Sequence, residues 1–195
     1  MMNRREFIQY SAAAAVSISR ASAMVMENIP QTKKIFPLYR GFNLLEKFSP
    51  WGLPQKFREE DFQIMADWGF NFARIPMSYW NWASKNDWFS IRQEVLEDID
   101  QVIDFGRQYG IHVNLNLHRI PGYCINDREQ EPVDLFDDTP ENMQKALDGA
   151  IFHWKMFARR YKTIPNSELS FDLINEPPST ADGTRHIEVV RALVE

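Results

Sequence analysis

The chain has 195 residues, 44% of them hydrophobic, which is enough to build the core of one ordinary domain and excludes wholesale disorder. Its 22 Lys and Arg against 27 Asp and Glu give a net charge of -5, so no basic surface for nucleic acid is expected. The single cysteine, Cys124, excludes a disulfide framework and any zinc site built from several thiolates.

The first 23 residues are expected to be an export signal rather than part of the fold. Paired arginines, Arg4 and Arg5, precede an Ala-rich apolar stretch over residues 10–19, and small residues at positions 21–23 are typical of a cleavage site. The pair and the mild hydrophobicity resemble a twin-arginine signal, which implies a periplasmic or extracellular protein. The stretch is shorter than the ~20 apolar residues of a spanning helix, so no membrane association is expected after cleavage. The alternative is an amphipathic N-terminus without an export role.

Strands and helices alternate along the rest of the chain. A strand is predicted over residues 39–43, a helix over 59–68, a strand over 70–75 ended by Pro76, a helix over 91–109 and a strand over 111–117. Gly110 is expected to end the second helix, and a long loop is expected from about His118 to Asp138. Thr139 and Pro140 then predict the start of a helix, because one suits the N-cap and the other the first helical position.

The chain continues with a strand over residues 169–174 and a helix from about Arg185. Four strand–helix units in this order predict a parallel α/β sheet, either an open doubly wound sheet or a (β/α)8 barrel. Neither glycine-rich nucleotide-binding motif follows a strand, which weakens the open-sheet alternative. We therefore expect residues 24–195 to be the N-terminal half of a TIM barrel, about four βα units, truncated after the fourth strand and the start of its helix.

Polar residues gather where the predicted strands end: Arg74, His118, and the pair Asn175 and Glu176. Catalytic groups of a barrel lie at these ends, so the four side chains are expected to converge. In the third strand, Val113, Leu115 and Leu117 alternate with Asn114, Asn116 and His118. Alternation places the two sets on opposite faces, the apolar one toward the helices.

Each of these residues also has a purely structural interpretation. Arg74 could form a surface ion pair, His118 could be a satisfied loop histidine, and Glu176 could be solvated in a turn before two prolines. A metal site is not expected, because His112 and His118 on one strand would lie about 20 Å apart. No cofactor is expected either, and Cys124 is expected to be a packed loop thiol.

Aromatic residues are dense after the second and third strands. Trp80, Trp82 and Tyr123 are candidates for stacking on the apolar faces of sugar rings, and the alternative is that they pack the loops themselves.

Four segments together resemble glycoside hydrolase family 5, the cellulase family, over about residues 38–195. They are Gly41-Phe42-Asn43-Leu44, then Trp68-Gly69-Phe70-Asn71-Phe72-Ala73-Arg74-Ile75-Pro76, then Leu117-His118-Arg119 with Pro121-Gly122, and Phe171-Asp172-Leu173-Ile174-Asn175-Glu176-Pro177.

The resemblance implies a retaining glycosidase that uses two glutamates about 5 Å apart. Glu176 would be the general acid/base, Asn175 would bind the sugar 2-hydroxyl, Arg74 would support the charge of the nucleophile, and His118 would contact the sugar in the cleaved subsite. The nucleophilic glutamate of the family follows the seventh strand, and no residue of this chain corresponds to it. We therefore expect the chain by itself to be inactive.

The expected function is hydrolysis of the O-glycosyl bonds of a β-linked polysaccharide, such as cellulose, another β-glucan or mannan, so the expected partner is a polysaccharide or oligosaccharide. The alternatives are a non-catalytic glycan-binding remnant or pseudo-enzyme, and a half-barrel without ligand function that persists by self-association.

Overall fold

The computed structural model describes residues 37–48, 56–179 and 183–195, and Tyr39–Glu195 forms one compact unit. The predicted export signal over residues 1–23 lies outside the described residues. Within the described ranges, no helix is both long enough and apolar enough to cross a membrane.

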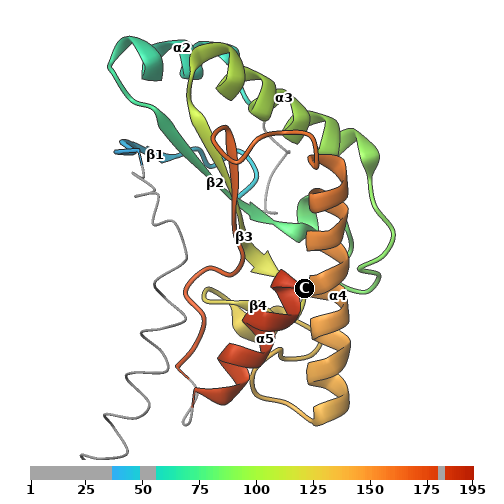
Figure 1. The fold of residues 1–195 in the computed structure, drawn as a ribbon. Coiled ribbons are helices and arrows are strands. Elements are labelled where there is room, and N and C mark those ends of the chain that lie inside the picture. The colour runs from blue at the N-terminus through green and yellow to red at the C-terminus, as the bar shows by residue number, and fades with distance from the viewer. Residues whose placement is uncertain (1–36, 49–55, 180–182) are drawn as a thin grey trace, which may run out of the picture. The chain divides into compact units, whose positions relative to one another are not determined.

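Four parallel strands form the sheet, and they stand in the order in which the chain produces them (Figure 1). They are β1 (Gly41–Asn43), β2 (Phe72–Ser78), β3 (His112–Ile120) and β5 (Leu169–Asp172), and the short β4 (Tyr123–Cys124) pairs antiparallel with the end of β3. This is the strand order of the first half of a (β/α)8 barrel. The predicted fold class is thereby confirmed, and the carboxyl ends of the four strands share one edge.

The helices follow the predicted pattern. They are α2 (Glu59–Asp67), α3 (Gln93–Tyr109), α4 (Pro140–Arg160) and α5 (Thr184–Val194), with short 3-10 helices η1 (Tyr79–Asn81) and η2 (Arg128–Gln130). Thr139 caps α4 by accepting a hydrogen bond from the Asn142 backbone N–H at 3.3 Å. Gly110 ends α3 at a φ of 68°, the left-handed region that glycine enters without strain.

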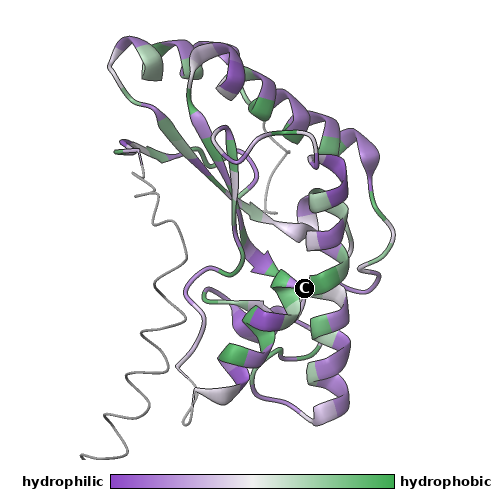
Figure 2. Cartoon of the chain, in the orientation of Figure 1, coloured by the Kyte–Doolittle hydropathy of each residue, from purple (hydrophilic) through white to green (hydrophobic). Residues whose placement is uncertain are grey.

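The core lies between the sheet and helices α3 and α4. Val113, Leu115 and Leu117 of β3 are completely buried, and a Cβ added to Gly106 of α3 would come within 2.5 Å of Val113. This close approach places the apolar face of β3 against α3. In Figure 2 the outer side of α3 is largely purple, which is typical of an amphipathic helix whose other side is buried.

The strand β2 runs beyond the predicted end at Pro76 and finishes at Ser78. The reason lies in the neighbouring segment after β1. The N–H of Leu44 donates to the carbonyl of Arg74, and the N–H of Ser78 donates to the carbonyl of Lys47. The backbone polar groups of Arg74 and Ser78 thus face the segment after β1, and Pro76, two residues from each, faces the same side. Because the proline nitrogen does not face β3, it removes no hydrogen bond between β2 and β3.

The predicted loop after residue 117 is also partly wrong. The strand β3 continues through His118 to Ile120 and turns back at once, so that Ile120 pairs with Tyr123. Gly122 makes the tight turn possible with a φ of 78°. His118 is therefore a strand residue rather than a loop residue, which fixes its backbone.

Candidate active site

The register of the sheet places the predicted polar residues on one face. Arg74 of β2 is opposite Asn114 of β3, which is opposite Ser170 of β5. Two residues further along β5, Asp172 points to the same face as Ser170 because side chains alternate. The long guanidinium of Arg74 therefore reaches the end of β5.

Arg74 joins the ends of two strands. Its Nε and Nη2 both donate to Asp172 Oδ2, at 3.1 and 3.0 Å, and its Nη2 also donates to Asn175 Oδ1 at 2.8 Å. Asp172 was not among the predicted site residues, although its position three residues before Asn175 could have suggested it. The carboxylate and the amide together fix the guanidinium plane.

Asn175 keeps one hydrogen-bonding group unused. Its side chain is 5% exposed, and its Oδ1 accepts from Arg74. Its buried Nδ2 has no hydrogen-bond partner among the described residues. Since a buried amide donor is normally satisfied, this N–H group points to a ligand that supplies the acceptor.

Glu176 follows in a conformation that is rare for glutamate. Its φ is 44°, in the left-handed region, and its side chain is exposed to solvent. The Tyr123 hydroxyl donates to the Glu176 carbonyl at 2.6 Å, so the hairpin after β3 holds the backbone of this residue. A strained backbone held from a neighbouring element is typical of functional positions.

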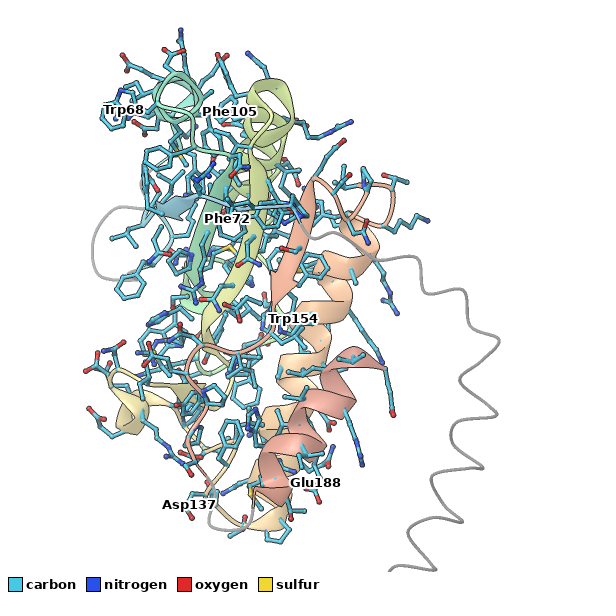
Figure 3. The ribbon with its side chains drawn as sticks, turned by 60° about the vertical axis from the view of Figure 1, so that its left-hand side comes forward. Trp68, Phe72, Phe105, Asp137, Trp154 and Glu188 are labelled. Atoms are coloured by element: carbon cyan, nitrogen blue, oxygen red, sulfur yellow. The ribbon has the colours of Figure 1, made fainter. Side chains whose placement is uncertain are left out.

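The wall behind this segment comes from α4. Trp154, labelled in Figure 3, lies between α4 and β5, and its Nε1 donates to the Leu173 carbonyl at 3.0 Å. Its ring packs on Phe171 with centroids 5.2 Å apart. The end of β5 is thus fixed on its helix side by one aromatic residue.

His118 lies on the same face of β3 as Asn116, whose Nδ2 is 3.3 Å from the Asp172 carbonyl. The His118 ring is half-buried, and its Nε2 is 3.0 Å from Asn126 Oδ1. Phe48 packs against the ring with its edge, with centroids 4.5 Å apart. The contacts with Asn126 and Phe48 therefore give His118 a defined ring orientation.

The three aromatic candidates have different environments. Trp80 is half-buried, and the guanidinium of Arg119 lies 4.0 Å from its ring centroid. Trp82 is completely buried, donates from Nε1 to His153 Nδ1 at 3.1 Å and packs on Phe157. The prediction that Trp82 stacks on a sugar is therefore wrong, because both faces of its ring belong to the core.

Tyr123 is likewise only 1% exposed, and its ring packs edge-on against Phe136. Burial raises the pKa of its hydroxyl, which stays a donor to Glu176. Stacking of Tyr123 on a sugar is excluded for the same reason as for Trp82. Its contribution to the site is the hydrogen bond to the Glu176 backbone.

Sequence reasoning missed a buried ion pair beside the site. Arg119 Nη1 donates to Glu131 Oε1 at 2.8 Å, and the two side chains are 5% and 0% exposed. Glu131 Oε2 accepts from the Tyr79 hydroxyl at 2.8 Å and from the Gly122 N–H at 3.2 Å. Burial raises the pKa of Glu131 above its ordinary value, although its donors oppose this.

Two further aromatic groups complete this cluster. Trp88 Nε1 donates to the Tyr79 hydroxyl at 3.1 Å, and the Trp80 ring lies under Arg119. We refer to these five residues as the Arg119 network: Tyr79, Trp80, Trp88, Arg119 and Glu131. The network ties the segment after β2 to the hairpin after β3.

Cys124 is 2% exposed, and burial raises the pKa of its thiol, so it is the packed thiol that the sequence predicted. Across the described ranges, no group of three His, Cys, Asp or Glu side chains is arranged to hold a metal ion.

Comparison with protein families gives a match over residues 31–195 to the model described as "Cellulase (glycosyl hydrolase family 5)". Among curated proteins, cellodextrinase A of Ruminococcus flavefaciens is 31% identical over 119 residues, 61% of this chain and 33% of that protein. The sporulation-specific glucan 1,3-beta-glucosidase of Saccharomyces cerevisiae is 38% identical over 128 residues, 62% of this chain and 27% of that protein. The chain thus spans about a third of the length of these relatives.

Solved structures agree with the sheet order. A crystal structure described as a glycoside hydrolase has a TM-score of 0.69 and 34% identity over 80% of this chain and 48% of that chain. A Thermotoga maritima Cel5A mutant in complex with cellobiose has a TM-score of 0.59 and 25% identity over 80% of this chain and 50% of that one.

Proposed function

Because the chain belongs to glycosyl hydrolase family 5, we propose that it carries the acid/base side of a retaining site that acts on β-linked glucan. The observation that carries this proposal is the Asn175–Glu176 pair. Arg74 fixes the amide of Asn175 while its buried Nδ2 stays without an acceptor in the described residues, next to the exposed carboxylate of Glu176.

Glu176 is the proposed general acid and base. In the first step it gives its proton to the glycosidic oxygen, so that the leaving sugar departs as an alcohol. In the second step the carboxylate takes a proton from the water that releases the glycosyl group. Solvent exposure of the side chain suits both steps, since leaving group and water approach from the same side.

Asn175 is proposed to donate from Nδ2 to the sugar 2-hydroxyl, a hydrogen bond that strengthens in the transition state. Arg74 orients Asn175 and places positive charge where the second carboxylate must stay ionised. His118 is proposed to contact the sugar in the cleaved subsite, and Trp80 to pack on a neighbouring sugar. Trp82 and Tyr123 support these residues from the interior.

The second carboxylate of the retaining pair is needed for hydrolysis. In the family it follows the seventh strand, and the described residues form four parallel strands. We therefore propose that the residues of this chain supply glycan binding and the acid/base group, and that turnover needs a nucleophile about 5 Å from Glu176. By itself the chain is proposed to bind glycan without cleaving it.

A β-glucan is favoured over mannan as the glycan. The named relatives from Ruminococcus and Saccharomyces are a cellodextrinase and a glucan 1,3-β-glucosidase, and both names denote β-glucan substrates.

We also propose that residues 1–23 are a twin-arginine export signal and that residues 24–195 are the barrel domain. Replacing Arg4 and Arg5 by lysine should block export; unchanged export would contradict the twin-arginine route.

Calorimetric titration with cellohexaose and with laminarihexaose tests the binding half of the proposal. The wild-type chain should bind at least one of them, and Asn175→Ala should weaken that binding about fivefold, since one hydrogen bond is worth about 1 kcal/mol. Glu188→Gln is the matched control, because Glu188 lies on α5 and should have no effect (Figure 3). Absence of binding by the wild-type chain would contradict the proposal.

Reducing-sugar release from barley β-glucan tests the catalytic half. Binding without release is the result expected for the chain by itself, whereas release that depends on Glu176 would contradict the need for a further nucleophile. Wherever the second carboxylate is present, azide should restore turnover of an activated aryl β-glucoside by Glu176→Ala. The product should be the β-glycosyl azide, because the nucleophile still inverts once before azide attacks; an α-glycosyl azide would contradict the acid/base role.

A further inference from the structure

Two neighbouring residues of β3 converge on one loop residue. Arg119 Nη2 donates to the backbone carbonyl of Asn126 at 3.1 Å, and His118 Nε2 lies 3.0 Å from the side-chain Oδ1 of the same Asn126. Asn126 itself is exposed, and the next residue, Asp127, has a φ of 56°. Asn126 is therefore tied to β3 through both its backbone carbonyl and its side chain.

Arg119 is held far more firmly than Asn126. It is 4% exposed, and Glu131 binds its Nη1 at 2.8 Å. Glu131 is in turn fixed by the Tyr79 hydroxyl and the Gly122 N–H. The guanidinium carbon Cζ of Arg119 lies 4.0 Å from the Trp80 ring centroid, so the same cation also contacts that ring.

We propose that Arg119 and Glu131 are a positioning pair for the glycan site: through Asn126 they fix the His118 imidazole as its Nε2–H tautomer, and through the cation contact they fix the Trp80 ring. This inference rests on the proposed function, because the two groups that it orients are those proposed to touch the sugar. Neither Arg119 nor Glu131 contacts the sugar itself.

The tautomer follows from the acceptor. Asn126 Oδ1 can only accept, so the His118 nitrogen that faces it must carry the proton. His118 Nδ1 is then the lone-pair nitrogen, and it is buried without a hydrogen-bond partner in the described part of the chain. Under-satisfied buried acceptors are tolerated more often than orphaned N–H groups, so this assignment is the favourable one.

Arginine is needed at position 119 for a geometric reason. The planar guanidinium presents five N–H donors and a flat face, so it can bind Glu131, bind Asn126 and stack on Trp80 at the same time. A lysine ammonium at the same place keeps the charge but cannot lie flat on a ring while it reaches two acceptors. Arg119→Lys therefore tests the positioning role of residue 119 without removing its positive charge.

Imidazole ring signals in ¹³C and ¹⁵N NMR spectra, recorded without sugar, provide the first test. The chain has four histidines, and the signal lost in His118→Gln identifies residue 118. In the wild type it should report the Nε2–H tautomer. In Arg119→Lys and in Asn126→Ala it should move to a mixture of tautomers, and Asn126→Asp, which supplies an acceptor of similar reach, should restore it.

Arg128→Lys is the matched control. Arg128 lies in the same loop and pairs with Asp134, but has no contact with His118 or Trp80 among the described interactions. It should leave the His118 tautomer unchanged. Asn126 is exposed, so Asn126→Ala keeps the test informative even where Arg119→Lys fails to fold.

Titration with cellohexaose is the second test. Arg119→Lys should bind about two- to tenfold more weakly than wild type, the effect of roughly one lost hydrogen bond, and Arg128→Lys should bind as wild type does. An unchanged His118 tautomer in folded Arg119→Lys and Asn126→Ala would overturn the positioning role, whatever the binding. A tautomer that responds as stated in a chain that binds no glycan would leave the positioning pair intact and overturn the proposed function instead.

Discussion

The Arg119 network and the end of β5 lie at the same edge of the sheet but are built in opposite ways. In the network, the ion pair between Arg119 and Glu131 is almost completely buried, and Glu131 also accepts from Tyr79 and from the Gly122 backbone. At the end of β5, the pair between Arg74 and Asp172 is 24% and 37% exposed, and Asn175 keeps a donor without a partner in the described residues.

This difference indicates that the Arg119 network supports the surrounding structure, whereas the end of β5 is suited to bind a ligand. A buried ion pair whose charged groups are bound by the chain itself, as Arg119 and Glu131 are, rigidifies its surroundings and reaches a ligand only through the residues that it positions. A half-exposed cluster with an unused donor is incomplete until a ligand arrives. Removing a charge from the first region should therefore cost mainly stability, and mutations in the second region should act mainly on binding.

The largest effect should come from breaking the buried pair. Glu131→Ala leaves the Arg119 charge buried without a counter-ion, so we expect a loss of about 3–5 kcal/mol in the free energy of unfolding. Asp172→Ala at the other region should cost only about 1 kcal/mol, because water reaches Arg74. Urea unfolding of both variants measures the difference, and equal losses would show that the two regions do not differ in kind.

The next largest effect concerns the pH dependence of stability and comes from His153, another completely buried residue. Burial lowers the pKa of His153 to about 3 from an ordinary 6.5, and its neutral ring accepts from Trp82. Between pH 6.5 and 3, His153 binds a proton in the unfolded chain but not in the folded chain, so a falling pH lowers the free energy of unfolding. Above pH 6.5, His153 is neutral in both states and adds no pH dependence. From pH 7 to pH 5 we expect the wild type to lose about 2 kcal/mol more stability than His153→Gln.

Denaturant unfolding at the two pH values measures this loss for each protein. Glutamine can still accept from Trp82, so the variant isolates protonation from the loss of that hydrogen bond. Parallel pH dependence in the two proteins would mean that His153 takes up its proton in the folded state at an ordinary pH.

A smaller effect is expected for Arg74→Lys, and on a different quantity. Lysine keeps the charge but cannot bind Asp172 and Asn175 together, so the Asn175 amide loses its fixed orientation. Affinity for the glucan oligosaccharide that the wild-type chain binds should fall about two- to tenfold, while the unfolding free energy changes by less than about 1 kcal/mol. A large loss of stability with unchanged affinity would reverse the roles of the two regions.

The smallest effect should come from Tyr123→Phe, which removes one hydrogen bond to the Glu176 carbonyl and leaves the ring in place. We expect a loss of about 0.5–1.5 kcal/mol in stability. Thermal unfolding with and without the oligosaccharide measures it. If the hairpin holds Glu176 as described, the loss should shrink when ligand is bound, since the ligand then orders the same segment.

Local patterns made most of the fold predictable from sequence. The alternation of Val113, Leu115 and Leu117 with polar residues correctly separated the two faces of β3, and Thr139 and Gly110 correctly marked helix ends. The extension of β2 through Pro76 was missed because it depends on which side of the strand the proline nitrogen faces. That property belongs to the sheet rather than to the proline.

The site was predictable only where residues stand at strand ends. Arg74 and Asn175 follow from that rule, and the structure joins them by a hydrogen bond. Glu131 could not be found, because it is one of many acidic residues in its loop and its burial depends on Arg119 and Tyr79. Trp82 was misassigned because the residues that bury it, His153 and Phe157, lie more than 70 positions away along the chain.

The left-handed backbone of Glu176 sets the stability of the chain against the acid/base role proposed for this residue. A non-glycine residue at a φ of 44° carries a conformational penalty of about 1–2 kcal/mol that glycine would avoid. Random mutagenesis with selection for heat resistance alone would therefore enrich glycine at position 176, and the same substitution deletes the carboxylate. An engineer who stabilises the chain by screening must therefore hold this codon fixed to keep the proposed acid/base group.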